Sequence, residues 1–184
     1  FFRHSKIGIA SVRSGNVIGG GDWSVDRLIP DCFRSITKNE KIILRNPSAI
    51  RPWQFVLEPI FGMFSLALRL RKKPTYFSEP WNFGPSLDKK LTVEQVVKKI
   101  IKQWGKGKYE IYSNKKDKSY HESKLLMLNS IKANKLLEWK SIYTNTESLF
   151  ETIEWYKQYN DKNNMKDFTL KQIEKYVINM TKDD

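Results

Sequence analysis

The strongest hydrophobic pattern of the chain is an unbroken run of small and β-branched residues near its beginning, from Ile7 to Val12. A run of this kind is typical of a parallel strand that is covered on both faces. A glycine-rich stretch from Ser14 to Trp23 follows it, carrying Asn16 and Asp22, with Arg13 just before. Because parallel strands present ligands at their carboxyl ends, we expect this stretch to be a ligand loop.

Two helices and a strand are predicted in the segments that follow. Asp26 is expected to cap a helix from Arg27 to about Lys38, whose opening turn tolerates Pro30. Lys41 to Leu44 is expected to be a short strand, and a second helix is expected to begin at Glu58-Pro59. One face of the second helix is apolar and should pack on a sheet or on another helix. That face consists of Ile60, Met63, Phe64, Ala67 and Leu70.

The most distinct helix signal is a capping box of Thr92 and Gln95 in front of a periodic row of apolar residues. The row consists of Val93, Val96, Val97, Ile100 and Ile101. Gly105 and Gly107 are expected to stop this helix. Strands are expected at Trp81 to Phe83, before Gly84-Pro85, and at Tyr109 to Tyr112, and a charged turn at Asn114 to Lys118.

Three more helices are expected in the last third of the chain, which makes the predicted fold class mixed α/β. Their amino caps should be Ser130, Ser148 and Thr169, the last with Gln172 in capping-box position. The helix after Ser148 is expected to bury Leu149, Ile153 and Tyr156. The helix after Thr169 is expected to bury Leu170, Ile173 and Val177, and the polar stretch Asp161 to Lys166 should separate the two.

Composition narrows the class of protein. The chain has 184 residues, 40% of them hydrophobic, which is enough for a core and excludes disordered and fibrous classes. The single cysteine, Cys32, cannot form an internal disulfide, and no secretory signal is visible, so we expect a cytoplasmic setting. The longest apolar stretch, Ile60 to Leu70, is too short to span a bilayer, and we expect no membrane anchor. The tryptophans expected in the core are Trp53, Trp81, Trp104 and Trp139.

The net charge of +13 suits a nucleic-acid surface, an acidic ligand or a lysine-rich proteome. The lysines are spread along the whole chain and no RNA-binding motif is present, which favours solvated helix faces over nucleic-acid binding. A basic nucleic-acid-binding module stays as the alternative from another class, and a steep salt dependence of DNA binding would favour it. The two histidines and one cysteine lack ligand spacing, so a metal site has no support.

Six motifs follow one another along the chain. They are Arg13 to Trp23, Arg27 to Asp31, Leu44 to Pro47 with Ile50 to Gln54, Trp81 to Pro85, His121-Glu122, and Phe168 to Ile173 with Tyr176. Together they resemble the NAD-dependent extended short-chain dehydrogenases that act on nucleotide sugars, most narrowly the 4,6-dehydratase branch. Each motif alone recurs by chance, but all six in the order of the family are specific.

The resemblance implies the end of a Rossmann-type parallel sheet in residues 1–25, followed by a smaller mixed α/β nucleotide-sugar-binding domain with a helical tail in residues 26–184. The family's Gly-x-x-Gly-x-x-Gly turn, acidic ribose-binding residue and Tyr-x-x-x-Lys pair would all precede Phe1. The chain is therefore expected to be a carboxyl-terminal half that contains no catalytic residue. Gly19 to Gly21 is no substitute for the turn, because it follows the last strands of such a sheet.

For the complete enzyme, the resemblance implies NAD as cofactor and CDP-glucose as substrate. The reaction would oxidise C4, remove water across C5 and C6, and return the hydride to C6, giving CDP-4-keto-6-deoxyglucose. The complete enzyme is expected to be a homo-oligomer, and this chain without the amino-terminal Rossmann half is expected to be inactive. Another extended short-chain epimerase or dehydratase, using a different nucleotide, is the alternative within the class.

Two residues carry the expected contact with phosphate. Arg51 matches the pyrophosphate arginine of the family, and arginine suits this ligand because it stays cationic and can form two parallel hydrogen bonds. A surface ion pair is the alternative for Arg51. Asn16 matches an asparagine that binds phosphate or sugar, and its alternative is a hydrogen bond to its own loop.

A second group is expected around the nucleotide. Arg27, Leu28 and Pro30 match the helix start that contacts it, where free backbone N–H groups favour anions, although Arg27 could also be a solvated first-turn residue. Ile43 and Leu44 would flank the base, or else form a merely buried strand.

The remaining expected contacts are with the sugar, the base and the cofactor. Asn82 matches a conformational or substrate-contacting residue, or else satisfies a turn. His121 and Glu122 match a segment that closes over the nucleotide, where Glu122 would accept from cytosine or ribose. Ser14 and Gly15 would lie near the nicotinamide carboxamide of NAD.

Overall fold

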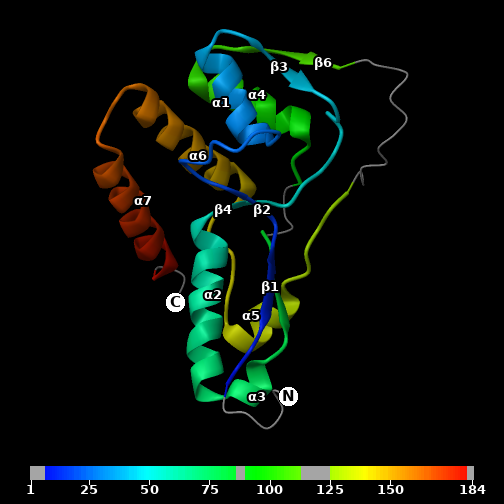
Figure 1. Ribbon diagram of the computed structural model, residues 1–184, viewed down its shortest axis with the longest axis vertical. Coiled ribbons are helices and arrows are strands. Elements are labelled where there is room, and N and C mark those ends of the chain that lie inside the picture. Colours follow the sequence, from blue (N-terminus) through cyan, green and yellow to red (C-terminus); the bar gives the residue numbers. More distant parts are fainter. Residues whose placement is uncertain (1–6, 86–89, 113–124, 182–184) are drawn as a thin grey trace.

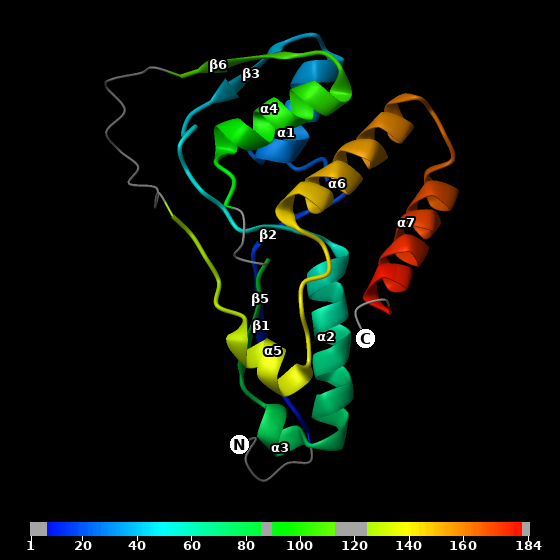
Figure 2. The same cartoon turned by 180° about the vertical axis from the view of Figure 1, so that it is seen from behind.

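The computed structural model describes residues 7–85, 90–112 and 125–181, which form an elongated molecule (Figure 1). Its lower end in Figure 1 contains β1 (Ser11–Ser14), α2 (Leu57–Lys72), α3 (Pro74–Phe77), β5 (Pro80–Phe83) and α5 (Ile131–Leu137). Its upper end contains α1 (Leu28–Thr37), β3 (Lys41–Leu44), α4 (Val93–Trp104), β6 (Lys108–Ile111) and α6 (Asn145–Asn160). Strands β2 (Asn16–Ile18) and β4 (Trp53–Phe55) lie between the ends, and α7 (Met165–Met180) lies beside α6, as the reverse view also shows (Figure 2).

All three strand pairs among the described residues are parallel. β1 pairs with β5, β2 with β4 and β3 with β6. Parallel partners need long crossover connections, and each of these pairs is joined by a stretch of chain that contains at least one helix. The mixed α/β fold class predicted from the sequence is confirmed.

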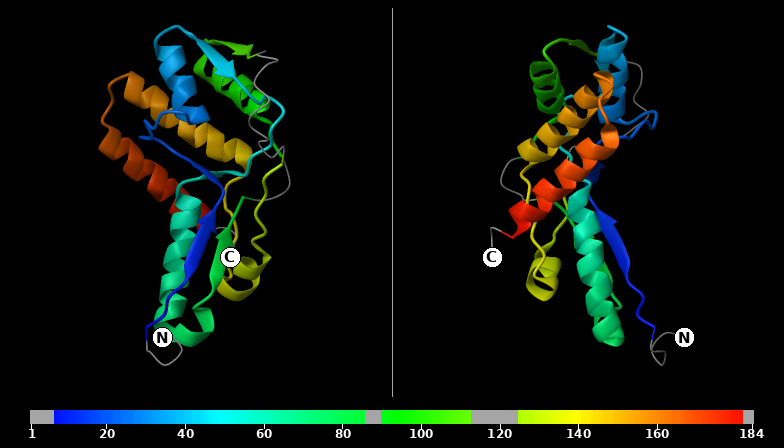
Figure 3. Two further views of the ribbon diagram at one scale, coloured as in Figure 1. Left: turned by 45° about the vertical axis from the view of Figure 1, so that its right-hand side comes forward. Right: turned by 90° about the vertical axis from the view of Figure 1, so that its left-hand side faces the viewer.

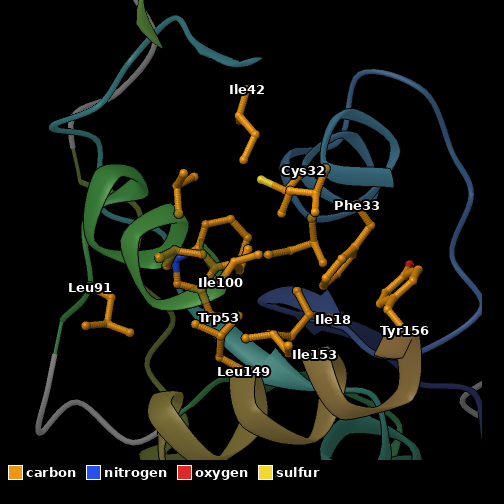
Figure 4. Packing of buried hydrophobic residues seen from close by; sticks show 14 of the residues in the cluster. Ile18, Cys32, Phe33, Ile42, Trp53, Leu91, Ile100, Leu149, Ile153 and Tyr156 are labelled. Atoms are coloured by element: carbon orange, nitrogen blue, oxygen red, sulfur yellow. The ribbon is translucent and has the colours of Figure 1, made fainter. Parts of the chain in front are cut away.

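The main hydrophobic core lies at the upper end, where α1, α4 and α6 meet (Figure 4). Figure 4 shows Cys32 and Phe33 of α1 facing the same interior as Ile100 of α4 and Ile153 of α6. A second cluster around Trp81, Phe83 and Trp139 fills the lower end. The predicted burial of the tryptophans is confirmed for Trp53, Trp81 and Trp139, while Trp104 is partly buried against the upper core.

Cys32 is fully buried in the upper core, and burial followed by the charge of Asp31 raises the pKa of its thiol well above the usual range. Only the thiolate is strongly nucleophilic, so Cys32 is expected to be inert toward thiol reagents in the native protein at about pH 8. In denaturant the same thiol should react completely. Titration with a chromogenic disulfide in both states measures this, and rapid stoichiometric labelling of native protein would contradict it.

Local end signals predicted both ends of α4. α4 has the expected capping box, in which the Thr92 side chain accepts from the N–H of Gln95 and the Gln95 side chain accepts in return, and Gly105 ends the helix in the left-handed region. α1 also lies where predicted, but the cap was wrong. Arg27 is the N-cap residue without a side-chain cap bond, whereas Asp26 has a φ of 59° and pairs with Arg45.

The strand predicted from Ile7 to Val12 is wrong in extent. The strand β1 runs from Ser11 to Ser14, and the side chains of Ile7 and Ile9 are exposed at 65% and 44%. Both residues lie before β1, which has one neighbouring strand, β5, among the described residues. The prediction that it is a parallel strand is confirmed.

The helix predicted from Glu58 is present as α2, but it buries a different face. Ile60, Met63 and Phe64, expected to be inside, are exposed, and the buried row runs instead through Glu58, Pro59, Gly62 and Leu66. The close approach to β5 requires a glycine there, since a Cβ at Gly62 would lie 2.6 Å from the ring of Phe83. Figure 3 shows α2 lying alongside β1 and β5. Periodicity identified the apolar stripe, but packing selected the stripe that contains Gly62.

Two of the three predicted carboxyl-terminal caps are wrong. α6 begins earlier, at a capping box of Thr144 and Glu147, and Ser148 lies buried inside it. α7 is capped by Asn164, while Thr169 lies within it and accepts a hydrogen bond from Trp155 Nε1 at 2.9 Å. Ser130 does precede α5, but its hydroxyl accepts from the N–H of Gly84 instead of capping the helix.

Burial within these two helices differs from one to the other. Leu149, Ile153 and Tyr156 are buried in α6, as predicted. In α7 the prediction was wrong, because Leu170, Ile173 and Val177 are exposed and the buried residues are Gln172 and Tyr176. Tyr176 donates its hydroxyl hydrogen to the carboxylate of Glu58, and hydrophobic periodicity cannot predict a polar contact of this kind. None of the described helices combines the length and apolarity needed to cross a bilayer, and the charged turn predicted at Asn114 to Lys118 lies outside the described residues.

Candidate functional site

The chain changes its partner strand at Gly15. β1 ends at Ser14 beside β5, and β2 begins at Asn16 beside β4. In α/β folds ligands bind beyond the carboxyl ends of the parallel strands. Three residues predicted to contact ligands, Ser14, Gly15 and Asn16, therefore form one bend, here called the elbow, between the two ends of the molecule (Figure 1).

The elbow is held closely against the segment that enters β4. A Cβ at Gly15 would lie 2.3 Å from the carbonyl oxygen of Pro52, so only glycine fits. The N–H of Asn16 donates to that carbonyl at 2.8 Å, and the N–H of Gly15 donates to Gln54 Oε1 at 3.1 Å. The side chain of Asn16 makes no hydrogen bond within the part of the chain that the structure describes. It is half-buried and stays available as a ligand contact.

Arg51 directly precedes Pro52, whose carbonyl accepts the hydrogen bond from the N–H of Asn16. Its side chain is buried, with 9% of the residue exposed, and Nη1 donates to the carbonyl of Ile50 at 2.9 Å. The backbone of Ile50 in turn forms isolated β-bridges with Thr92 and with Leu125. Arg51 is therefore a buried residue, and the choice between a ligand contact and an ion pair stays a prediction. A buried guanidinium next to the elbow suits an anionic ligand.

Asn82 is connected on both sides. Its Oδ1 accepts from Arg13 Nη1 at 3.3 Å, and its Nδ2 donates to the carbonyl of Asn129 at 3.3 Å. Arg13 lies opposite Asn82 in the β1–β5 register. The side chain thus bridges β1, β5 and the segment before α5, which favours the conformational role over direct ligand contact.

The second group of predicted residues gathers at the upper end, where α1 begins and β3 ends. The two elements are joined by the ion pair of Asp26 with Arg45, at 3.8 Å. The side chains of Arg27 and Ile43 are exposed, at 65% and 54%. The other members are more enclosed: Leu28 is half-buried, and Pro30 and Leu44 are buried.

Burial limits what this second group can do. The Leu44 side chain faces the core, and its carbonyl accepts from the N–H of Tyr112, so a flanking apolar contact with a base falls to Ile43. Arg27 forms an ion pair with Asp22 at 3.5 Å. Burial alone would raise the pKa of Asp22, but hydrogen bonds from Ser24 and the charge of Arg27 lower it. His121 and Glu122 lie outside the described residues.

The glycine run Gly19 to Gly21 has a packing role that the sequence did not reveal. A Cβ at Gly20 would lie 2.0 Å from the indole ring of Trp155 in α6, and Gly21 has a φ of 79°, which favours glycine. The loop therefore rests on α6, and Tyr156 also donates its hydroxyl hydrogen to the carbonyl of Asp22. This packing explains why the run needs glycines without invoking a phosphate.

Gly20→Ala is expected to destabilise the protein by about 1 to 3 kcal/mol, since the added methyl group must displace a large ring. The same substitution should cost much less in a Trp155→Ala background, where the obstructing ring is absent. Urea unfolding of the four proteins in this cycle measures both effects. Equal costs in the two backgrounds would show that the ring is not the reason for the glycine.

Two hollows on the described surface lie apart from most of these residues. The larger, about 680 Å³, is lined mainly by aromatic rings and by the turn between α6 and α7, and includes Trp23, Phe33, Trp104 and Tyr159. The smaller, about 470 Å³, is lined by Lys41, Lys98, Lys102 and Lys108 around Gly107. Neither of these two hollows contains Asn16 or Arg51, so we define the candidate site by the elbow and its contacts.

Solved structures with a similar arrangement define the fold. A dTDP-glucose 4,6-dehydratase from Bacillus anthracis in complex with NAD aligns with a TM-score of 0.65 at 22% identity, over 83% of this chain and 45% of that one. A UDP-glucuronic acid 4-epimerase from Bacillus cereus in complex with UDP-glucuronic acid and NAD aligns with a TM-score of 0.66 at 16% identity, over 80% and 45%. The fold is that of Rossmann-type extended short-chain dehydrogenases.

A sequence relative narrows the class further. Over 181 residues, 98% of this chain, the sequence is 42% identical to CDP-glucose 4,6-dehydratase of Salmonella typhimurium. The chain spans 50% of the length of that protein. No family model matches the chain. The resemblance to the 4,6-dehydratase branch of the extended short-chain dehydrogenases, expected from the six motifs, is confirmed.

Sequence reasoning missed Gln54 and Trp155, which hold the elbow and the glycine run in place. Gln54 had one visible signal, a polar side chain in the apolar stretch from Trp53 to Val56. Trp155 had none, because its contact with Gly20 joins residues more than a hundred positions apart.

Proposed function

We propose that this chain forms the nucleotide-sugar-binding part of an NAD-dependent 4,6-dehydratase that acts on CDP-glucose. The observation that carries the proposal is the 42% identity to CDP-glucose 4,6-dehydratase over almost the whole chain. The position of the elbow at two strand ends adds support, because ligands bind beyond such ends in α/β folds. The buried Arg51 beside it also adds support, because the pyrophosphate of a nucleoside diphosphate sugar needs a cation that stays charged at any working pH.

Each residue has a proposed role. Arg51 holds the pyrophosphate, and Asn16 donates or accepts at a phosphate or at the sugar. Arg27 and Leu28 meet the nucleotide at the start of α1, where backbone N–H groups without helical partners favour an anion. Ile43 offers an exposed apolar surface for the base. Asn82 maintains the spacing between β1 and β5, and Glu122 and His121 complete the nucleotide contact.

Of the cofactor, this chain contacts only the nicotinamide end, through Ser14 and Gly15. Bound NAD would take the hydride from C4 of the sugar and return it to C6. The glycine run does not fit the cofactor's phosphates, because Trp155 occupies the space over Gly20. The phosphate-binding turn and the acid and base residues are therefore assigned to an amino-terminal Rossmann half beyond these 184 residues, in a complete enzyme that we expect to be a homo-oligomer.

The test is an assay of the complete protein with NAD and CDP-glucose, with detection of a 4-keto sugar against a boiled control. Product is expected with CDP-glucose, and none is expected from the 184-residue chain alone. Parallel reactions with UDP-glucose and dTDP-glucose address the alternative within the class, since turnover of one of these in place of CDP-glucose would refute the substrate assignment. Binding to DNA that weakens steeply with salt, without competition from sugar nucleotides, would instead support a nucleic-acid-binding module.

A further inference from the structure

Gln54 is a polar residue in the centre of β4, between Trp53 and Phe55, and it is fully buried. Side chains alternate along a strand, so Gln54 points away from the side taken by its two aromatic neighbours. Its Oε1 accepts a hydrogen bond from the N–H of Gly15 at 3.1 Å. Burying an amide costs free energy unless it is hydrogen-bonded. Here the hydrogen bond of Oε1 links β4 to the elbow.

Two consecutive N–H groups of the elbow are occupied by β4 and the segment entering it. Gly15 donates to Gln54, and Asn16 donates to the carbonyl of Pro52 at 2.8 Å. The space is equally restricted, because a Cβ on Gly15 would lie 2.9 Å from Gln54 Oε1 and closer still to Pro52. The backbone of the elbow is thus placed by its neighbours and offers neither of these amides to a ligand. What it can present is the half-buried side chains of Ser14 and Asn16.

We propose that Gln54 is a positioning residue, which sets the place of Ser14 and Asn16 relative to the nucleotide sugar by fixing the backbone of Gly15. The inference rests on the proposed function. Because Gln54 is fully buried, it acts through Gly15 and not by touching the ligand. Its acceptor oxygen performs the task, since Nε2 makes no hydrogen bond within the described residues.

The experiment compares variants of the complete protein with NAD and CDP-glucose. Gln54→Met keeps the shape of the side chain but removes the acceptor, whereas Gln54→Glu keeps an acceptor oxygen. The matched control is Gln172→Met, which removes another buried amide, one that donates to Glu151 in α6, away from the elbow. Thermal melting of each variant reports the loss of stability.

Gln54→Met is expected to lower kcat/KM between about 10-fold and 100-fold, as small misplacements of binding groups do. Gln54→Glu should recover most of the loss, and Gln172→Met should stay within about twofold of the wild type even where it melts at a lower temperature. A wild-type kcat/KM for Gln54→Met would overturn the inference. So would activity losses in Gln54→Met and Gln172→Met that follow their losses of stability, since that pattern describes a merely structural role.

A second readout separates this inference from the proposed function. Amide hydrogen exchange at Gly15 should be faster in Gln54→Met than in the wild type and slow again in Gln54→Glu, whether or not CDP-glucose is the substrate. If the wild type turns over no sugar nucleotide, the proposed function fails while the exchange measurement still decides whether Gln54 fixes the elbow. Unchanged exchange at Gly15 would refute the positioning role directly.

Discussion

Replacing Glu58 with leucine is expected to destabilise the protein by about 3 kcal/mol or more, because it leaves several buried donors without an acceptor. Glu58 is fully buried at the start of α2. Its carboxylate accepts from the N–H of Ile142 at 3.0 Å, from the N–H of Tyr143 at 2.7 Å and from the hydroxyl of Tyr176 at 3.1 Å. One side chain thereby ties α2 to the segment before α6 and to α7. Urea unfolding measures the loss.

A double-mutant cycle isolates one of these contacts. Tyr176→Phe removes only the hydroxyl and is expected to cost about 1 kcal/mol in the wild type. In the Glu58→Leu background the hydroxyl has lost this partner, so the same change should cost little or become favourable. Additive losses would show that the Tyr176 to Glu58 hydrogen bond contributes nothing to stability.

Glu58 should also give the stability a recognisable pH dependence. Burial raises the pKa of Glu58, although hydrogen bonds from Tyr143 and Ile142 act in the opposite direction. The folded protein then holds this proton more tightly than the unfolded chain does. The contribution of Glu58 to stability is therefore largest below its unfolded pKa and decreases as the pH rises through the folded one. The difference in unfolding free energy between wild type and Glu58→Gln should fall over that interval, and a rising difference would contradict the shift.

Arg51→Ala is expected to weaken the binding of CDP to the complete protein by about 1.5 to 3 kcal/mol, the range for a hydrogen bond to a charged group. Arg51→Lys keeps the charge but loses the planar fork, and should recover only part of the affinity. The matched control is Arg71→Ala, which removes an exposed arginine from the last turn of α2. Because Arg51 is buried, a thermal melt must confirm folding of each variant. Calorimetry that finds an unchanged dissociation constant for CDP would refute the assignment.

Features set by neighbours in the sequence were predictable. The capping box of Thr92 and Gln95, and the left-handed Gly105 that ends α4, depend on residues within a turn or two of each other. The six motifs likewise sufficed to predict the resemblance to the 4,6-dehydratase branch, because motif order is a property of the chain alone. The same motifs suggested Asn16 and Arg51, whose roles remain predictions that the experiments above test.

Features that depend on distant partners were not predictable. Threonine is a common helix cap, yet Asn164 caps α7. The hydroxyl of Thr169 accepts a hydrogen bond from Trp155 Nε1 instead. The apolar stripe of α2 was visible, but the stripe that packs is the one where Gly62 lets the ring of Phe83 approach. In both cases the local sequence allowed two arrangements, and a contact with another element determined which one formed.

The sequence by itself determined the α/β class, the helices with strong end signals and the resemblance to the 4,6-dehydratases, because these follow from local periodicity and from the order of residues. Only the tertiary structure decided which helix faces are buried, why Gly15 and Gly20 must be glycines, and how Gln54 and Glu58 are used. Those outcomes arise where close packing and hydrogen bonds join segments far apart in the chain, and neither interaction leaves a periodic trace in the sequence.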